Sequence, residues 1–278
     1  MIKTKTFFFL SIITIVLFSC KKSSEKDHSL PKNENLSPKI NVEKLLTNYK
    51  DWWTYHSNNI VLNSDFAGYD IQSNKITKNK FLKLLKTSSY IPIKLKSTKK
   101  ENHYKLYKLP VSVNTDISKT IKYESLISLK YFEMEGRSFP EFNLTALDKK
   151  NYTNKNTKGK ITVFKTWFIN CQACIAEFGE LNNFVDKNKA TINFISLATD
   201  FEEKLKSFLQ KRPFKYAVVA NQKEFIEKQL KFTIYPTHIV VDEQGIILKI
   251  TNSASEMISF VENRTEFNKK LLPPPPSS

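Results

Sequence analysis

Apolar and polar residues follow three different patterns along the 278-residue chain. Residues 7–18 are almost continuously apolar, residues 21–40 are polar without periodicity, and the remainder mixes both kinds. From Lys160 onward, short apolar segments alternate with segments whose apolar residues recur every three or four positions, which is typical of strands and amphipathic helices. The pattern therefore predicts a leader, a polar tether and a folded remainder.

The C-terminal half has the more regular pattern. The predicted strands span 160–168, 191–198, 216–220, 236–242 and 246–251. The predicted helices span 174–188, 200–211, 222–230 and 255–267. Asp200 and Glu203 have the spacing of a capping box at the start of the second helix. This order of elements predicts an α/β fold in which helices flank both faces of a central sheet.

A smaller α+β region, residues 41–130, precedes that sheet. It contains predicted helices at 42–55 and 76–87, a strand or turn at 59–69, and strands at 90–95 and 103–109. No element is predicted between Leu109 and Lys130. Residues 130–148 are expected to be a join with an extended lead-in strand, followed by a hairpin over 151–159. The first region carries no chemical motif, because His56 and His103 lack neighbours at ligand spacing, so its role stays unassigned.

The N-terminal residues predict where in the cell the protein is located. Lys3 and Lys5 precede the apolar run, which is too short to span a bilayer, and Ser19-Cys20 follows it. This pattern resembles a bacterial lipoprotein signal over residues 1–19, with lipid attached to Cys20 and a flexible tether over 20–40. We therefore expect a lipid-anchored protein of the cell envelope, facing the periplasm or the exterior of a Gram-negative bacterium. Residues 271–278 are predicted to be a Pro-rich tail.

The composition limits the partners of the protein. Removing residues 1–19 leaves 259 of the 278 residues, and the 13% aromatic content predicts a substantial core. The formal charge of +17 falls to +15 when Lys3 and Lys5 are lost with the signal. The lysines are scattered, which argues against nucleic-acid binding and favours attraction to an anionic membrane or to acidic partner proteins.

The three cysteines of the chain are Cys20 and the pair in Cys171-Gln172-Ala173-Cys174. A single C-x-x-C between a predicted strand and a predicted helix is typical of a redox motif. A cysteine at a helix start faces unpaired N–H groups, so Cys171 is expected to be the thiolate nucleophile and Cys174 the resolving thiol. A purely structural bridge would close too short a loop to stabilise the fold much.

These residues carry a family resemblance. Trp167-Phe168-Ile169-Asn170-Cys171-Gln172-Ala173-Cys174, together with the distant Tyr235-Pro236-Thr237-His238, resembles the thioredoxin-like proteins of the TlpA/ResA type over about residues 130–270. The resemblance implies a thioredoxin-like domain over 131–270 and thiol–disulfide oxidoreductase activity. It also implies that the Cys171–Cys174 disulfide is the only redox group, with no other cofactor and no metal. Partners would be proteins with disulfides or thiols and an upstream thiol donor.

The resemblance also implies a cis peptide at Pro236, beside the cysteine pair. The backbone of Tyr235 would then be free to pair with an extended substrate segment. His238 shares the strand face of Pro236, so it either approaches the sulfurs or is a packed, hydrogen-bonded histidine.

Two positions depart from the family pattern. Lys165 stands where relatives often carry Asp, Glu or Asn, and it either modulates the pKa of the cysteines or pairs with water or an acid. Gly179 stands where relatives commonly have a kinking proline, which is compatible with a bend there.

Several functions are compatible with the sequence. The leading hypothesis is a membrane-tethered thiol–disulfide oxidoreductase that reduces specific partners. The second is a Cu(I)-type metal carrier using Cys171, Cys174 and His238, although carriers on this fold usually space their cysteines C-x-x-x-C. A thiol peroxidase is disfavoured because Phe168, three residues before Cys171, has no hydroxyl. The last is a non-enzymatic binding lipoprotein in which residues 41–130 carry the binding function.

Overall fold

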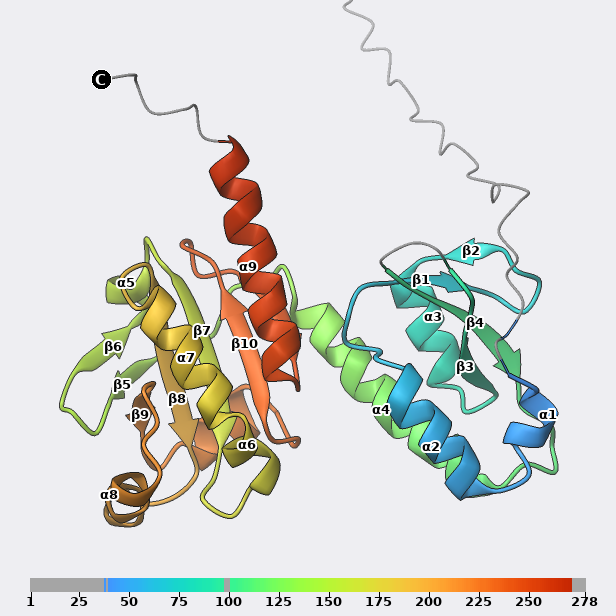
Figure 1. The fold of residues 1–278 in the computed structure, drawn as a ribbon, viewed down its shortest axis with the longest axis horizontal. Coiled ribbons are helices and arrows are strands. Elements are labelled where there is room, and N and C mark those ends of the chain that lie inside the picture. The colour runs from blue at the N-terminus through green and yellow to red at the C-terminus, as the bar shows by residue number, and fades with distance from the viewer. Residues whose placement is uncertain (1–37, 39, 98–100, 272–278) are drawn as a thin grey trace, which may run out of the picture.

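The computed structural model describes residues 38, 40–97 and 101–271, with the backbone alone for residues 265–271. Two domains lie side by side and are joined by the long helix α4 (Thr115–Met134) (Figure 1). The predicted signal peptide, Cys20, nearly all of the tether and residues 272–278 of the predicted Pro-rich tail lie outside the described residues. Within the described ranges, no helix combines the length and the apolar character needed to cross a bilayer.

The N-terminal domain is a four-stranded sheet in the order β2-β1-β4-β3, packed against helices. Its elements are α1 (Val42–Leu45), α2 (Tyr49–Asn59), β1 (Phe66–Tyr69), β2 (Lys75–Ile76), α3 (Lys78–Leu85), β3 (Tyr90–Lys94) and β4 (Asn102–Lys108). Trp52, Phe81 and Tyr104 are fully buried in its core. The α+β prediction is confirmed. The single helix predicted at 42–55 is wrong, because the side chain of Asn48 accepts a hydrogen bond from the Asp51 N–H and starts a second helix.

Helix α4 is the element that the sequence pattern did not predict. Its buried positions include Ser125 and Ser128, so the apolar stripe that marks an amphipathic helix is diluted. Ile117 and Ile121 pack in the N-terminal core, whereas Tyr131 packs in the C-terminal one. The boundary predicted between residues 130 and 131 therefore falls inside a helix that both domains share.

The C-terminal domain has a five-stranded sheet in the order β11-β10-β7-β8-β9. The strands are β7 (Ile161–Trp167), β8 (Ile192–Ala198), β9 (Ala217–Val219), β10 (Thr237–Val241) and β11 (Ile247–Thr251). β7, β8 and β9 are parallel, and β10 and β11 are antiparallel. The helices are α6 (Gln172–Ala176), α7 (Phe178–Asn188), α8 (Glu202–Lys211), the π-helix η1 (Phe225–Gln229) and α9 (Ala254–Leu271). This is the predicted α/β, thioredoxin-like arrangement.

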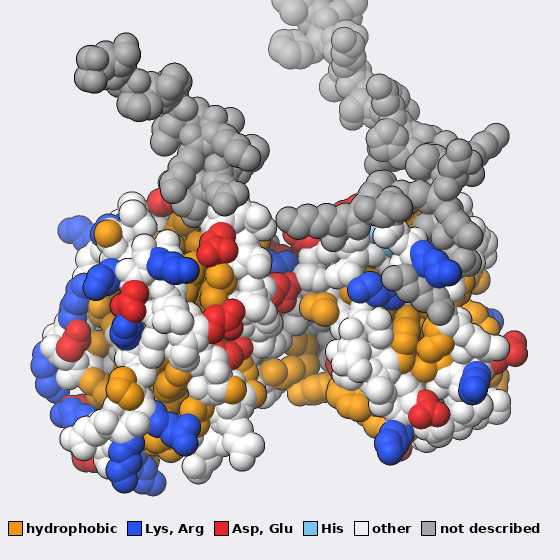
Figure 2. Space-filling view, viewed as in Figure 1, with side chains coloured by type: hydrophobic (Ala, Val, Ile, Leu, Met, Phe, Trp, Pro, Cys, Tyr) orange, Lys and Arg blue, Asp and Glu red, His pale blue; other side chains and the backbone are white. Residues whose placement is uncertain are grey.

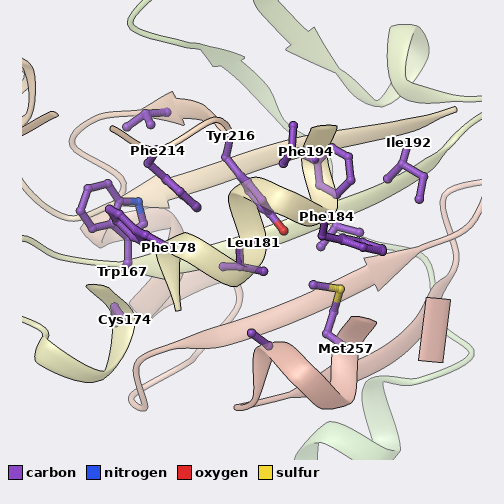
Figure 3. Close-up of a cluster of buried hydrophobic side chains, with 14 of the residues drawn as sticks. Trp167, Cys174, Phe178, Leu181, Phe184, Ile192, Phe194, Phe214, Tyr216 and Met257 are labelled. Atoms are coloured by element: carbon purple, nitrogen blue, oxygen red, sulfur yellow. The ribbon is translucent and has the colours of Figure 1, made fainter. Parts of the chain in front are cut away.

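Both faces of this sheet are covered by apolar side chains. On one face, residues of α7 and α9 pack with Val163 and Trp167 (Figure 3). On the other face, Phe164 packs with Tyr131 of α4 and with Phe225 and neighbouring residues of η1. Side chains therefore alternate between the two faces along β7, with Val163 and Trp167 on one and Phe164 on the other.

Four local predictions are wrong. The hairpin expected at 151–159 is a two-stranded unit of β5 (Asn143–Thr145) and β6 (Asn151–Thr153) followed by α5 (Asn154–Thr157). The helix expected at 222–230 is reduced to η1. Phe201, not Asp200, is the N-cap of α8, and it makes no side-chain cap. The helix expected at 174–188 is interrupted at Glu177, which ends α6 and precedes α7, so the bend lies two residues before Gly179.

Candidate active site

Cys171 and Cys174 lie where the loop after β7 enters α6, and they form a disulfide bridge. Cys171 is the N-cap residue of α6, and its Sγ accepts the N–H of Cys174 at 3.2 Å. Cys171 keeps 7% of its surface exposed, whereas Cys174 keeps none. Cys174 lies at the edge of the aromatic core, below Trp167 and Phe178 (Figure 3). Of the two cysteines, only Cys171 therefore has surface that solvent can reach.

The loop that carries Cys171 is held from β8. Asp200, just beyond the end of β8, accepts the N–H of Ile169 on its Oδ2 at 2.8 Å. The N–H of Cys171 itself donates to the carbonyl of Phe168 at 3.1 Å. Asp200 is thus a site residue that the sequence reasoning missed, because its spacing to Glu203 indicated a local helix cap instead.

The segment before β10 forms the second part of the site. The peptide bond between Tyr235 and Pro236 is cis, as the resemblance implied. The ring of Tyr235 contacts that of Phe168 edge to face, with centroids 5.4 Å apart. Among the described residues, the backbone N–H and C=O of Tyr235 have no hydrogen-bond partner. These groups are therefore available to a peptide lying beside the cysteine loop.

Asn252, in the turn after β11, braces this segment. Its Nδ2 donates to the Pro236 carbonyl at 2.7 Å and to Thr237 Oγ1 at 3.0 Å. Its Oδ1 accepts the Nδ2 of Asn63, a residue of the N-terminal domain, at 3.0 Å. The cis-proline segment is therefore tied directly to the other domain. No spacing in the sequence pointed to Asn252 or Asn63, which are 189 residues apart.

Lys165 is fully buried and pairs with an acid, which is one of the two alternatives predicted for it. Its Nζ lies 2.5 Å from Glu177 Oε2, and β7 pairs with β10 so that Lys165 stands opposite His238. Burial lowers the pKa of Lys165, while the charge and hydrogen bond of Glu177 oppose that effect.

Glu177 organises the interior beneath the cysteines. Its Oε2 accepts from Lys165 and from His238 Nε2 at 3.0 Å, and its Oε1 accepts the N–H of Ala254 at 2.9 Å. Burial raises its pKa, but the hydrogen bonds and charges of His238 and Lys165 outweigh that effect and hold the pKa at about 2. Glu177 is therefore ionised at neutral pH. No pattern in the sequence indicated a role for Glu177, because its partners Lys165 and His238 lie on other elements.

His238 is the packed, hydrogen-bonded histidine of the two alternatives. It is fully buried, and burial lowers its pKa, so the ring is neutral at neutral pH. A neutral ring that donates Nε2–H to Glu177 leaves Nδ1 unprotonated, and Nδ1 has no partner in the described part of the chain. Across the described ranges, no group of three His, Cys, Asp or Glu side chains could hold a metal ion.

Comparison with known proteins finds similarities that cover about half of the chain. The model described as AhpC/TSA family matches residues 136–250. The thiol-disulfide oxidoreductase ResA of Bacillus cereus is 26% identical over 151 residues, covering 51% of this chain and 84% of that protein. ResA of Bacillus thuringiensis is 26% identical over 141 residues, covering 50% and 79%. The thioredoxin domain of a thiol-disulfide oxidoreductase from Bacteroides vulgatus superposes with a TM-score of 0.43 at 20% identity, covering 47% of this chain and 96% of that one.

Proposed function

The chain is a thiol–disulfide oxidoreductase of the thioredoxin-like family, of the TlpA/ResA type, and from this premise we propose that it reduces disulfides of other proteins through Cys171 and Cys174. The observation that carries the proposal is the position of the pair. Cys171, which keeps 7% of its surface exposed, lies at the start of α6, its bonded partner Cys174 keeps none, and an unpaired peptide edge at Tyr235 lies beside the same loop.

The exchange proceeds in two steps. In the reduced protein the Cys171 thiolate attacks one sulfur of the partner disulfide, forms a mixed disulfide and releases the other partner sulfur as a thiolate. The Cys174 thiolate then attacks Cys171 Sγ, closes the Cys171–Cys174 disulfide and releases the second partner sulfur. Two electrons pass to the partner, two protons complete its thiols, and an upstream dithiol protein restores the reduced state.

Cys171 is assigned as the nucleophile and Cys174 as the resolving thiol. The N–H of Cys174 already points at Cys171 Sγ, and a hydrogen bond of this kind favours a thiolate over a thiol. The buried position of Cys174 confines it to attack on Cys171, because a bulky partner cannot reach it. No further cofactor is needed for this chemistry.

Substrate recognition is assigned to Tyr235 and Pro236. An extended substrate segment would pair with the free N–H and C=O of Tyr235 by strand addition, which aligns the partner disulfide with Cys171. The hydrogen bonds from Asn252 to the Pro236 carbonyl and to Thr237 hold that edge in place.

We also propose that the mature protein is anchored through acyl chains on Cys20 and works at the surface of the cell envelope. The Leu17-Phe18-Ser19-Cys20 run supports this location, since each buried CH₂ contributes roughly 0.8 kcal/mol to anchoring. Metabolic labelling with an alkynyl fatty acid tests it, because the label should enter the wild-type protein and be lost in Cys20→Ala.

The exchange itself is tested by trapping. Cys174→Ala, expressed in intact cells, should accumulate partner proteins on Cys171 as adducts that dithiothreitol releases, because the resolving sulfur is gone. The double variant Cys171→Ala/Cys174→Ala is the control and should trap nothing. Stoichiometric copper in the purified reduced protein, with no adducts in Cys174→Ala, would favour the metal carrier and refute the exchange.

The direction of electron flow has its own test. A reductase supplied by a donor keeps its own thiols reduced, so alkylation of intact cells should find Cys171 and Cys174 mainly as thiols. A pair found mainly as a disulfide would contradict the reductase direction and indicate an oxidant.

A further inference from the structure

The junction between the two domains forms a groove beside the cis-proline segment. The groove has a volume of about 500 Å³ and is lined from α3, from α4 and from residues 231–233. Thr233 in its wall is two residues before Tyr235. An adjoining hollow of about 270 Å³ shares Ile127 with it and includes Ile234. The peptide edge at Tyr235 therefore follows directly, in the chain, on residues that line the groove and the adjoining hollow.

The floor of the groove is apolar and partly exposed. Tyr123 and Leu126 of α4 keep 54% and 40% of their surfaces exposed, although both are large apolar residues. Phe232, only 1% exposed, closes the floor from the C-terminal domain. Figure 2 shows apolar side chains exposed where the two domains meet. Tyr123 and Leu126 therefore add exposed apolar surface to the groove, and contiguous apolar surface is a feature of interaction sites.

The rim of the groove is strongly basic. Four lysines line it, Lys83, Lys86, Lys130 and Lys231, against one acid, Glu133. None of the four lysines makes an ion pair with a carboxylate in the described part of the chain. The Lys130 Nζ donates to the Lys231 carbonyl and lies 5.0 Å from the centre of the Phe232 ring. Burial and the neighbouring charge of Lys231 lower the pKa of Lys130, so an added negative charge at this rim would be favourable.

We propose that this junction groove binds an extended acidic segment of the protein whose disulfide is exchanged. The inference rests on the proposed function, because it extends the substrate edge at Tyr235 into the N-terminal domain. The four lysines, none of them in an ion pair with a carboxylate, select negative charge, and the exposed Tyr123 and Leu126 accept apolar side chains between the acidic ones. It also gives the N-terminal domain a role, which is to present Lys83, Lys86 and one side of the groove.

The rise of an extended segment gives an approximate spacing for the acidic residues. A strand rises about 3.3 Å per residue, so a segment running from Tyr235 back to Phe232 covers about 10 Å. Acidic residues about three to five positions from the reacting cysteine would then reach the lysine rim. A flat bilayer surface fits the groove poorly, because Phe232, which lines it, is only 1% exposed and is out of reach of such a surface.

The test compares two peptides in a single-turnover reaction. Each carries one cysteine as a mixed disulfide with glutathione, and glutamates or lysines occupy the positions about three to five residues away on both sides. The reduced wild-type protein should react with the acidic peptide at least about tenfold faster, and the preference should shrink at high salt. Lys83→Glu/Lys86→Glu should lose the preference and react faster with the basic peptide, a gain that a misfolded variant could not show.

A matched control separates the groove from overall charge. Lys155→Glu/Lys158→Glu changes the charge equally at two exposed lysines that line neither the groove nor the adjoining hollow, and it should keep the preference. Equal rates for the two peptides in the wild type would overturn the groove proposal while leaving the exchange intact. No reaction with either peptide would instead overturn the proposed function. Loss of binding to anionic phosphatidylserine vesicles in Lys83→Glu/Lys86→Glu, with no peptide preference in the wild type, would assign the lysines to a membrane and refute the proposal.

Discussion

At the residue scale, Glu177 holds three polar groups in a place that solvent barely reaches. Its carboxylate binds the ammonium of Lys165, the ring of His238 and the N–H of Ala254. Ion pairs this deep add little net stability over an apolar replacement, but they fix the geometry of the elements that meet there. Here they fix β7, β10 and the starts of α7 and α9 beneath the cysteine pair.

Removing one member of the Lys165–Glu177 ion pair should lower the free energy of unfolding far more than removing both members. Glu177→Gln leaves the buried Lys165 ammonium without its counter-charge and should lower the free energy of unfolding by roughly 3–5 kcal/mol. Lys165→Met/Glu177→Gln should lie closer to the wild type than the sum of the single changes predicts. Urea denaturation of the four proteins measures the coupling.

An exposed pair supplies the control for that cycle. Lys228 and Glu224, one helical turn apart on the surface, should show little coupling when Lys228→Met and Glu224→Gln are combined. Additive losses at Lys165 and Glu177, as at the surface pair, would show that the buried ion pair is not formed.

The Glu177 carboxylate should make the free energy of unfolding depend on pH in the acid range. Its pKa is about 2 in the folded protein against an ordinary 4.5, so the unfolded chain binds more protons between these values. The stabilisation is complete above pH 4.5 and declines as the pH falls toward 2. Comparing the acid unfolding of wild type and Glu177→Gln measures it, and two parallel stability curves below pH 4.5 would contradict the low pKa.

At the element scale, the turn after β11 connects the cis-proline segment to the N-terminal domain. Asn252→Ala removes donors to the Pro236 carbonyl and to Thr237, and also the link to Asn63. We expect a loss of about 1–3 kcal/mol in the free energy of unfolding. We also expect the substitution to slow exchange with peptide disulfides more than exchange with a small disulfide. Single-turnover rates with the two substrates measure this.

Asn63→Ala separates the two roles of that turn. It removes only the bond between the domains and leaves the hydrogen bonds to Pro236 and Thr237, so its effect on peptide exchange should be smaller than that of Asn252→Ala. Equal effects of the two variants, or an equal slowing of both substrates in Asn252→Ala, would argue against a positioning role for Asn252.

Elements with strong local signals could be predicted from the sequence. The strands of the C-terminal sheet, the placement of Cys171 at a helix start and the faces of β7 all follow from periodicity and motif spacing. Helix α4 could not be predicted, because its buried serines interrupt the apolar stripe. The break at Glu177 depends on partners in β7 and β10, which no local pattern reveals.

At the scale of the whole molecule, a cluster of hydrogen bonds and ion pairs connects the two domains. Lys249 of β11 donates to the Asn63 carbonyl at 2.8 Å and lies 3.5 Å from Asp65 and 3.9 Å from Glu135. Lys78 of α3 donates to the carbonyls of Asn63 and Ser64 close by. The cluster joins residues far apart in the chain, so the sequence alone did not indicate that the first region would pack against the redox domain.

Lys78 should make the stability of this junction rise with pH. Burial and the charge of Lys249 lower its pKa to about 8, against the opposing effects of Glu135, Asp65 and Glu256. Because the unfolded chain keeps the ordinary value of 10.5, it binds more protons between pH 8 and 10.5, so folding is favoured as the pH rises through that range.

Urea denaturation between pH 7 and 10 measures that dependence by difference. The stability of the wild type relative to Lys78→Met should increase over this range, since the variant lacks the titrating group. A difference that stays constant or decreases with pH would show that Lys78 keeps an ordinary pKa at the junction.

The central claim is that the sulfur of Cys171 is ionised near neutral pH and accessible in the folded protein. Its most direct measurement is the rate of iodoacetamide modification of the fully reduced protein as a function of pH, with the modified cysteine identified by mass spectrometry. We predict fast modification of Cys171, little of Cys174, and a midpoint below the ordinary thiol value of about 8.5. A Cys171 that stays unmodified in the folded protein, or titrates as an ordinary thiol, would contradict the account.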